Sequence, residues 1–194
     1  MGLRKPPQPS WAINSAVDAL LKKEMDFCRK ENRAHGIFKE NGQEYIKPFN
    51  HKDLEIWQNP FTGIQFFDKE HNFLLYGGVD DVMEDSNGKL VVIDFKATAK
   101  KADILDTTDV WNNGESYKRQ LEIYNWLFKK NEFPVSEKGY LLYYNGDASK
   151  PHLGKEMYFR RTLIPFLLDT SWIDPIISEM HSCLQKDEIP ESKP

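Results

Sequence analysis

The chain has 194 residues, and 30 aspartates and glutamates against 26 lysines and arginines give it a formal charge of −4. Hydrophobic residues make up 40 % of the chain and charged residues 29 %, which is typical of a folded globular protein and too apolar for a disordered one. The acid excess argues against a protein that coats nucleic acid regardless of sequence, but not against a nucleic-acid enzyme with a locally basic rim. The length predicts one domain over residues 1–194, beginning with an extended, proline-rich segment over residues 1–10.

Membrane insertion and disulfide cross-linking both lack support in the sequence. No apolar run reaches the roughly 18 residues of a membrane-spanning helix, and no apolar stretch follows the basic N-terminus as in a signal peptide. Cys28 and Cys183 are the only cysteines, too few for a disulfide framework or for holding a structural zinc ion or an iron–sulfur cluster by themselves. We therefore expect a cytoplasmic protein, not bound to a membrane, whose two thiols are reduced and buried.

The first half of the chain begins with a helical pattern and then changes to strands. Apolar residues at spacings of three and four predict a helix from residue 10 or 14 to about residue 33. A loop or short strand follows over residues 41–50, and a short helix over residues 51–58 with Asn50 as its N-cap. Strands are expected over residues 64–67, 73–83 and 90–97, the last two joined by a hairpin turn over residues 84–89.

The second half alternates helices and strands. Residues 100–115 are polar and without periodicity, which indicates a mobile loop. Helices are predicted over residues 115–131 and 171–186, with strands over residues 139–144 and 157–163 between them. The core-facing stripes of the two helices would contain Tyr117, Leu121, Tyr124 and Phe128 in the first and Trp172, Ile176, Met180 and Cys183 in the second. This order predicts an α/β fold with a mixed central sheet flanked by helices.

Two charged residues share one face of an otherwise apolar strand. Side chains alternate between the two faces of a strand, so Asp94 and Lys96 lie on the face that also carries Leu90 and Val92. An acid and a base at this spacing are most often a solvated surface pair. The apolar strand makes full solvation harder to achieve, and burying such charges is costly unless something pairs with them. Both interpretations stay open on this pattern alone.

The hairpin before this strand brings a second carboxylate beside Asp94. A three-residue loop with glycine in the left-handed position pairs Asp85 with Lys89 and places Asp80 opposite Asp94. A two-residue loop shifts the register and places Asp81 there instead. In either register two carboxylates face each other about 5 Å apart, which destabilises a sheet unless a cation lies between them. Hard oxygen ligands at this separation suit Mg²⁺ or Mn²⁺, and Gly78 on the same face would leave room for a bulky substrate.

These motifs resemble the PD-(D/E)XK nuclease superfamily, in particular its RecB-like and CRISPR-associated exonuclease branches. Such proteins typically show a Gly-x-x-Asp strand, matched here by Gly77 to Asp80, then a hairpin and an apolar strand ending in Asp/Glu-x-Lys, matched by Asp94 to Lys96. A helix with Gln-x-x-x-Tyr follows, present here as Gln120 and Tyr124, which share a helix face at i, i+4. The resemblance extends over about residues 14–145 and implies a restriction-endonuclease-like core.

The resemblance implies a role for each matched residue. Asp80, Asp94 and the carbonyl of Phe95 would be metal ligands, and Lys96 would orient or deprotonate the attacking water and stabilise charge in the transition state. Gln120 and Tyr124 would steady the edge of the site or a DNA phosphate, although Tyr124 is equally explained by core packing. RecB-like members often carry a metal-binding histidine in the first helix. Asp18 is the expected substitute here, and Glu24 is the further candidate.

The resulting hypothesis is a metal-dependent DNA nuclease. It would hydrolyse phosphodiester bonds with Mg²⁺ or Mn²⁺, and the resemblance points to exonuclease-like work in DNA repair, recombination or defence. Many relatives hold an iron–sulfur cluster on terminal cysteines, but Cys28 and Cys183 lie inside predicted helices, so no cluster is expected in this chain. The alternative is a non-catalytic nucleic-acid-binding or assembly module on the same fold.

Overall fold

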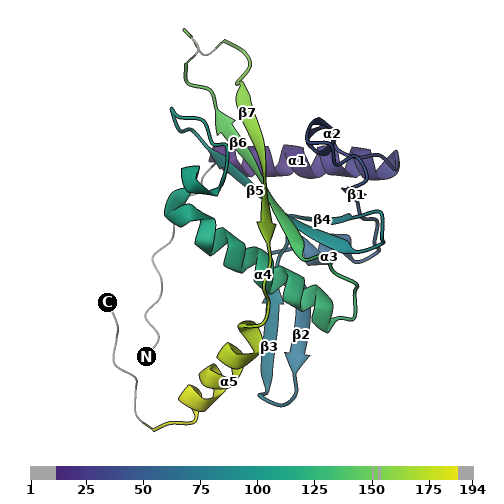
Figure 1. The fold of residues 1–194 in the computed structure, drawn as a ribbon, viewed down its shortest axis with the longest axis vertical. Helices are drawn as coiled ribbons and strands as arrows, with labels where there is room; N and C mark the ends of the chain where they lie inside the picture. The colour runs from purple at the N-terminus through teal and green to yellow at the C-terminus, as the bar shows by residue number, and fades with distance from the viewer. Residues whose placement is uncertain (1–11, 150, 153, 188–194) are drawn as a thin grey trace.

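A computed structural model of the chain describes residues 12–149, 151–152 and 154–187 (Figure 1). The extended segment expected over residues 1–10 lies outside the described residues. The main sheet has the strand order β1-β4-β5-β6-β7, and a separate two-stranded sheet pairs β2 with β3. The strands are β1 (Lys47–Pro48), β2 (Ile64–Asp68), β3 (Phe73–Gly77), β4 (Asp81–Glu84), β5 (Leu90–Thr98), β6 (Lys138–Gly146) and β7 (Phe159–Leu167). The helices are α1 (Ala12–Lys30), α2 (Gly36–Glu40), α3 (Leu54–Trp57), α4 (Glu115–Lys130) and α5 (Ile173–Leu184), with 3₁₀ turns η1 (Thr107–Asp109) and η2 (Trp111–Gly114).

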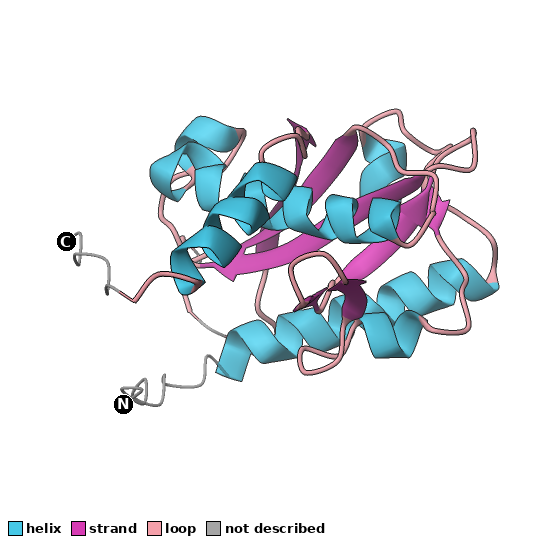
Figure 2. Ribbon diagram, turned by 90° about the horizontal axis from the view of Figure 1, so that it is seen from below, coloured by secondary structure: helices cyan, strands magenta, loops and turns pink. Residues whose placement is uncertain are grey.

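The main sheet is mixed and has helices on both faces. β5 pairs antiparallel with β4 and parallel with β6, and β6 pairs antiparallel with β7. Figure 2 shows the helix that follows the N-terminal trace, α1, on one side of the sheet and α4 on the other. Each interface has its own apolar core, around Met25 and Ile93 on the α1 side and around Leu121 and Val92 on the α4 side. The predicted α/β fold with a mixed sheet between helices is confirmed.

One expected strand, over residues 73–83, is two strands in different sheets. β3 ends at Gly77 and pairs with β2, whereas β4 begins at Asp81 and pairs with β1 and β5. Gly78 lies in the bend between them, where a Cβ would come within 2.8 Å of the Cα of Pro60. The prediction of a continuous strand was wrong because local β-propensity does not show where a chain changes its pairing partner.

The segment over residues 100–115 is structured, not the featureless loop that its polarity indicated. It contains η1 and η2, and the Asp106 side chain caps η1 by accepting hydrogen bonds from its backbone. Ile104 and Val110 are buried in the core on the α4 side. Asn145 in β6 also accepts a hydrogen bond from the Lys100 backbone N–H at 2.7 Å. Two buried apolar side chains and several capping bonds are enough to order such a segment without periodicity.

Two helices differ from their predicted form. α3 is only one turn long and takes Asp53, not Asn50, as its N-cap residue. In α5 the buried residues are Ile173 and Ile177, whereas Ile176 and Met180, predicted to face the core, are 41 % and 50 % exposed. The apolar pattern of α5 covers more than one face, so periodicity alone could not select the packed one.

Candidate active site

The β4–β5 hairpin has the three-residue loop. The Asp85 N–H donates to the Lys89 carbonyl at 3.0 Å, and Gly88 at φ 72° has the left-handed conformation that this loop requires. Asp81 pairs with Ile93, so the next position along the register sets Asp80 opposite Asp94. The alternative with Asp81 opposite Asp94 was wrong.

A cleft of about 600 Å³ opens over this pair of carboxylates, and residues of both α1 and α4 line it. The side chains come from five elements or bends that are far apart in the sequence. Apart from the further candidate Glu24, the cleft wall includes the residues predicted for the site: Asp18, Asp80, Asp94, Phe95, Lys96, Gln120 and Tyr124.

Asp94 and Asp80 are like charges in a poorly solvated place. Asp94 is 1 % exposed, and the Lys96 ammonium lies against its Oδ2. Burial and the neighbouring Asp80 carboxylate raise the pKa of Asp94 to about 7, although the Lys96 ammonium acts to lower it. Asp80 accepts a hydrogen bond from the Phe95 N–H at 2.6 Å, yet burial still raises its pKa. The site therefore holds excess negative charge that a cation would neutralise.

The bend that carries Asp80 is held by the turn after α3. The Gln58 side-chain amide donates to the Asp80 carbonyl at 2.8 Å, and the Val79 N–H donates to the Trp57 carbonyl at 2.9 Å. Gly78 lines the cleft, but the space of its missing side chain is filled by the Asn59–Pro60 backbone. The sequence predicted that this space would leave room for a bulky substrate. In the structure it instead lets two backbone segments approach each other closely, and this contact fixes the position of Asp80.

The Gln-x-x-x-Tyr pair forms the α4 wall of the cleft. The Gln120 amide donates to the Tyr124 hydroxyl at 2.7 Å. Tyr124 is 8 % exposed and belongs to the core on the α4 side, packed so closely that a Cβ on Gly77 would come within 2.8 Å of its ring. Burial raises the pKa of Tyr124 to about 12, so its hydroxyl is protonated at neutral pH. Tyr124 thus packs the core with its ring and orients Gln120 with its hydroxyl.

The two α1 candidates for a further metal ligand lie in different places. Asp18 lines the cleft and forms an ion pair with Lys22 at 3.1 Å. Glu24 does not line the cleft and contacts His35 Nε2 at 2.9 Å. Within residues 12–149, 151–152 and 154–187, no group of three His, Cys, Asp or Glu side chains is arranged to hold a metal ion.

The chemistry of the donors nevertheless fits a hard divalent cation. The buried Oδ2 of Asp94 forms an ion pair with the Lys96 ammonium. Asp80 offers a second carboxylate on the same face, and the Phe95 carbonyl belongs to the residue between Asp94 and Lys96. Carboxylate and carbonyl oxygens are the ligands that Mg²⁺ and Mn²⁺ prefer.

Comparison with protein families agrees with this geometry. The model of the PD-(D/E)XK nuclease superfamily matches residues 4–185. The chain belongs to this superfamily. PD-(D/E)XK proteins are generally nucleases, which implies a nucleic-acid substrate. They typically use divalent metals. Searches of curated proteins and of solved structures gave no match.

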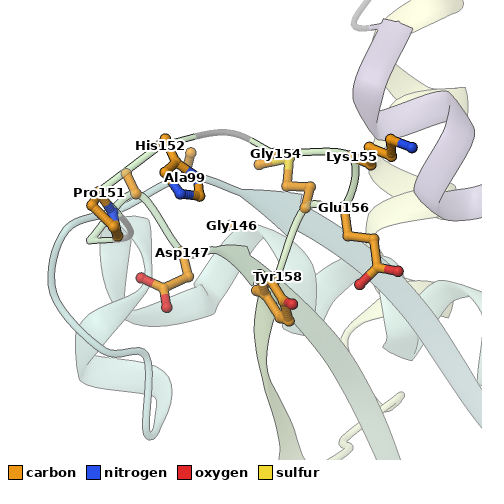
Figure 3. Close-up of a pocket in the computed structure, with 11 residues that line it drawn as sticks. Ala99, Gly146, Asp147, Pro151, His152, Gly154, Lys155, Glu156 and Tyr158 are labelled. Carbon is orange, nitrogen blue, oxygen red and sulfur yellow. The ribbon is translucent and has the colours of Figure 1, made fainter.

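A second pocket, of about 490 Å³, lies beyond the end of β6 (Figure 3). Asp147 and Glu156 lie on opposite sides of it, and Lys155 points away. It therefore lacks the paired carboxylates that characterise the PD-(D/E)XK cleft. Separately, no helix among the described residues is both long enough and apolar enough to cross a membrane.

Among the residues of this PD-(D/E)XK site that sequence reasoning missed are Tyr117 in the cleft and Gln58 behind it. Tyr117 lines the cleft, although its periodicity assigned it to the core. Its position three residues before Gln120, on the same helix face, was the available signal. Gln58 had no such signal, because nothing in a one-turn helix indicates which distant carbonyl its side chain will reach.

Proposed function

We propose that this PD-(D/E)XK chain is a metal-dependent DNA nuclease that hydrolyses phosphodiester bonds with Mg²⁺ or Mn²⁺. We further propose that the protein is exonuclease-like, as in the RecB-like and CRISPR-associated branches. It would act in DNA repair, recombination or defence in the cytoplasm. The observation that carries the proposal is the pair of facing carboxylates, Asp80 and Asp94, with the Lys96 ammonium on the same face of an open cleft. The proposal requires no iron–sulfur cluster on Cys28 or Cys183.

Each residue of the cleft has a role in this chemistry. Asp80, Asp94 and the Phe95 carbonyl would hold the cation, which when bound lowers the pKa of water and neutralises phosphate oxygens. The Lys96 ammonium orients the attacking water and stabilises the negative charge that develops on the phosphate. Gln120, held by the Tyr124 hydroxyl, donates to a phosphate oxygen at the edge of the site.

The direct test is cleavage of single- and double-stranded DNA by the purified chain. We expect cleavage with Mg²⁺ or Mn²⁺ and none after EDTA. Lys96→Met should lower the rate about a hundredfold or more, because it removes the cation beside the developing charge. Lys89→Met, at an exposed position of the hairpin, is the matched control and should leave the rate unchanged.

Two outcomes would contradict this proposal. One is intact DNA with either metal. The other is a Lys96→Met protein as active as wild type. Metal-independent DNA binding without cleavage, equal in both proteins, would favour the non-catalytic nucleic-acid-binding or assembly module instead.

The two α1 acids can be separated by metal binding. We propose Asp18 as the further ligand, because it lines the cleft whereas Glu24 is engaged with His35. Asp18→Asn should weaken Mn²⁺ binding, measured by calorimetry, about tenfold or more, and Glu24→Gln should leave it unchanged. Equal Mn²⁺ affinity in wild type and Asp18→Asn would remove Asp18 from the site.

A further inference from the structure

We propose that Tyr117 is a positioning residue for Lys96: the face of its ring keeps the ammonium in the cleft when a metal ion occupies the carboxylate of Asp94. This inference rests on the proposed function, because it assigns the residue that keeps the nuclease site's lysine in place. Tyr117 lies in the first turn of α4, three residues before Gln120.

The Lys96 ammonium lies between two partners. On one side it forms the ion pair with Asp94, and on the other its Nζ lies 5.1 Å from the centroid of the Tyr117 ring. A lysine ammonium within about 6 Å of an aromatic centroid is attracted to the negative face of the ring. The Lys96 side chain is 23 % exposed, so water competes only in part with these contacts.

The two contacts respond differently to a bound cation. A divalent ion on Asp94 draws the carboxylate charge toward itself and weakens the ion pair with Lys96. A lysine side chain released in this way regains rotamer freedom and turns toward water. The ring contact does not involve Asp94 and persists. Tyr117 is therefore the partner that retains Lys96 when the site is loaded.

The Tyr117 ring is itself supported from the sheet. Tyr143 in β6 is the parallel register partner of Lys96, and it is 6 % exposed beneath the cleft. Burial raises the pKa of Tyr143, and its interaction and side-chain hydrogen bond with the Tyr117 phenol raise it further. The other tyrosine of the cleft, Tyr124, has its hydroxyl engaged with Gln120. Among the described residues, Tyr117 is the one whose ring contacts the Lys96 ammonium.

The test is a series of ring variants assayed for DNA cleavage at saturating Mn²⁺. Tyr117→Leu should lower kcat about tenfold with KM within about twofold, because the lysine rather than substrate binding is affected. Tyr117→Phe should retain kcat within about twofold. Phenylalanines with one, two and three ring fluorines at position 117 should lower kcat stepwise, because fluorine weakens the ring face without changing its shape. Tyr76→Leu, at a half-exposed position outside the cleft, is the control and should behave as wild type.

A second measurement is independent of cleavage. Acylation of lysines by an amine-reactive ester in the presence of Mn²⁺, followed by mass spectrometry, should modify Lys96 several-fold faster in Tyr117→Leu than in wild type or Tyr117→Phe. Lys138, which is exposed, should react equally in all three proteins. The positioning role is overturned if Lys96 is acylated at the same rate in Tyr117→Leu as in wild type. It is also overturned if kcat does not change with the number of ring fluorines. If wild type cleaves nothing while the reactivity of Lys96 changes as expected, the proposed function fails and the Tyr117–Lys96 contact stands.

Discussion

Asp94→Asn is expected to abolish metal-dependent cleavage and, at the same time, to make the metal-free protein more stable. The rate should fall about a thousandfold or more, because the variant loses a charged ligand and the neutralising power of the site. The stability gain has the same origin. Asp94 is a buried charge beside Asp80, and an amide removes that repulsion. We expect a gain of about 2 kcal/mol, which corresponds to a rise in Tm of about 5 °C.

The stability gain should depend on pH. The pKa of Asp94 is raised to about 7 in the folded protein, so the folded state holds this proton more tightly than the unfolded state does. The contribution of Asp94 to stability is therefore fully present below the ordinary pKa near 4 and is lost as pH rises through about 7. The free energy of unfolding of Asp94→Asn should exceed that of wild type most at pH 8 and least at pH 5.

Thermal unfolding without metal and with Mn²⁺ measures both effects. Mn²⁺ should raise the Tm of wild type, because it binds only the folded site, and should barely change that of Asp94→Asn. Asp85→Asn, in the turn of the same hairpin, is the matched control and keeps both the metal response and the cleavage. If metal-free Asp94→Asn is less stable than metal-free wild type, repulsion between the facing carboxylates does not destabilise the protein.

Arg29→Met should lower the free energy of unfolding more than Asp81→Asn does. The Arg29 guanidinium donates to Asp81 Oδ1 at 2.5 Å and to the Phe49 carbonyl at 2.6 Å, and both side chains of the ion pair are almost fully buried. Removing the arginine leaves the Asp81 carboxylate buried without its counter-ion, which costs about 3–5 kcal/mol. Asp81→Asn should cost less, because Arg29 retains Asp26 and Phe49 as partners.

Chemical denaturation of the single and double variants tests this ion pair. Arg29→Met combined with Asp81→Leu should recover most of the loss, since no charge remains uncompensated. Arg33→Met is the control, because the side chains of the Arg33–Glu31 pair are 37 % and 47 % exposed and the pair contributes little. The matching single variants are Arg29→Met and Asp81→Leu. If the double variant loses as much free energy of unfolding as these two single variants lose together, Arg29 and Asp81 act independently.

Features that depend on local pattern were predictable. The alternation of β5 placed Asp94 and Lys96 on one face, and the Asn-Gly turn restricted the hairpin to two registers. The i, i+4 spacing of Gln120 and Tyr124 gave a pair that the structure joins by a hydrogen bond. In each case the interacting groups are close in sequence, so strand or helix geometry alone relates them.

Features that depend on partners distant in sequence were not predictable. The break between β3 and β4 follows from the packing of Gly78 against the Asn59–Pro60 turn. The order within residues 100–115 follows from bonds to β6 and from two buried side chains. The choice between Asp80 and Asp81 required the loop conformation at Gly88.

The amino-acid sequence by itself determined which residues can carry the chemistry and which of them share a strand or a helix face. Only the tertiary structure decided how strongly they act on one another. Asp80 and Asp81 are neighbours of the same residue type, yet one faces Asp94 in an open cleft and the other is buried against Arg29. Charge interactions depend on burial and on distance through space, and both are set by packing between elements rather than by the order of residues.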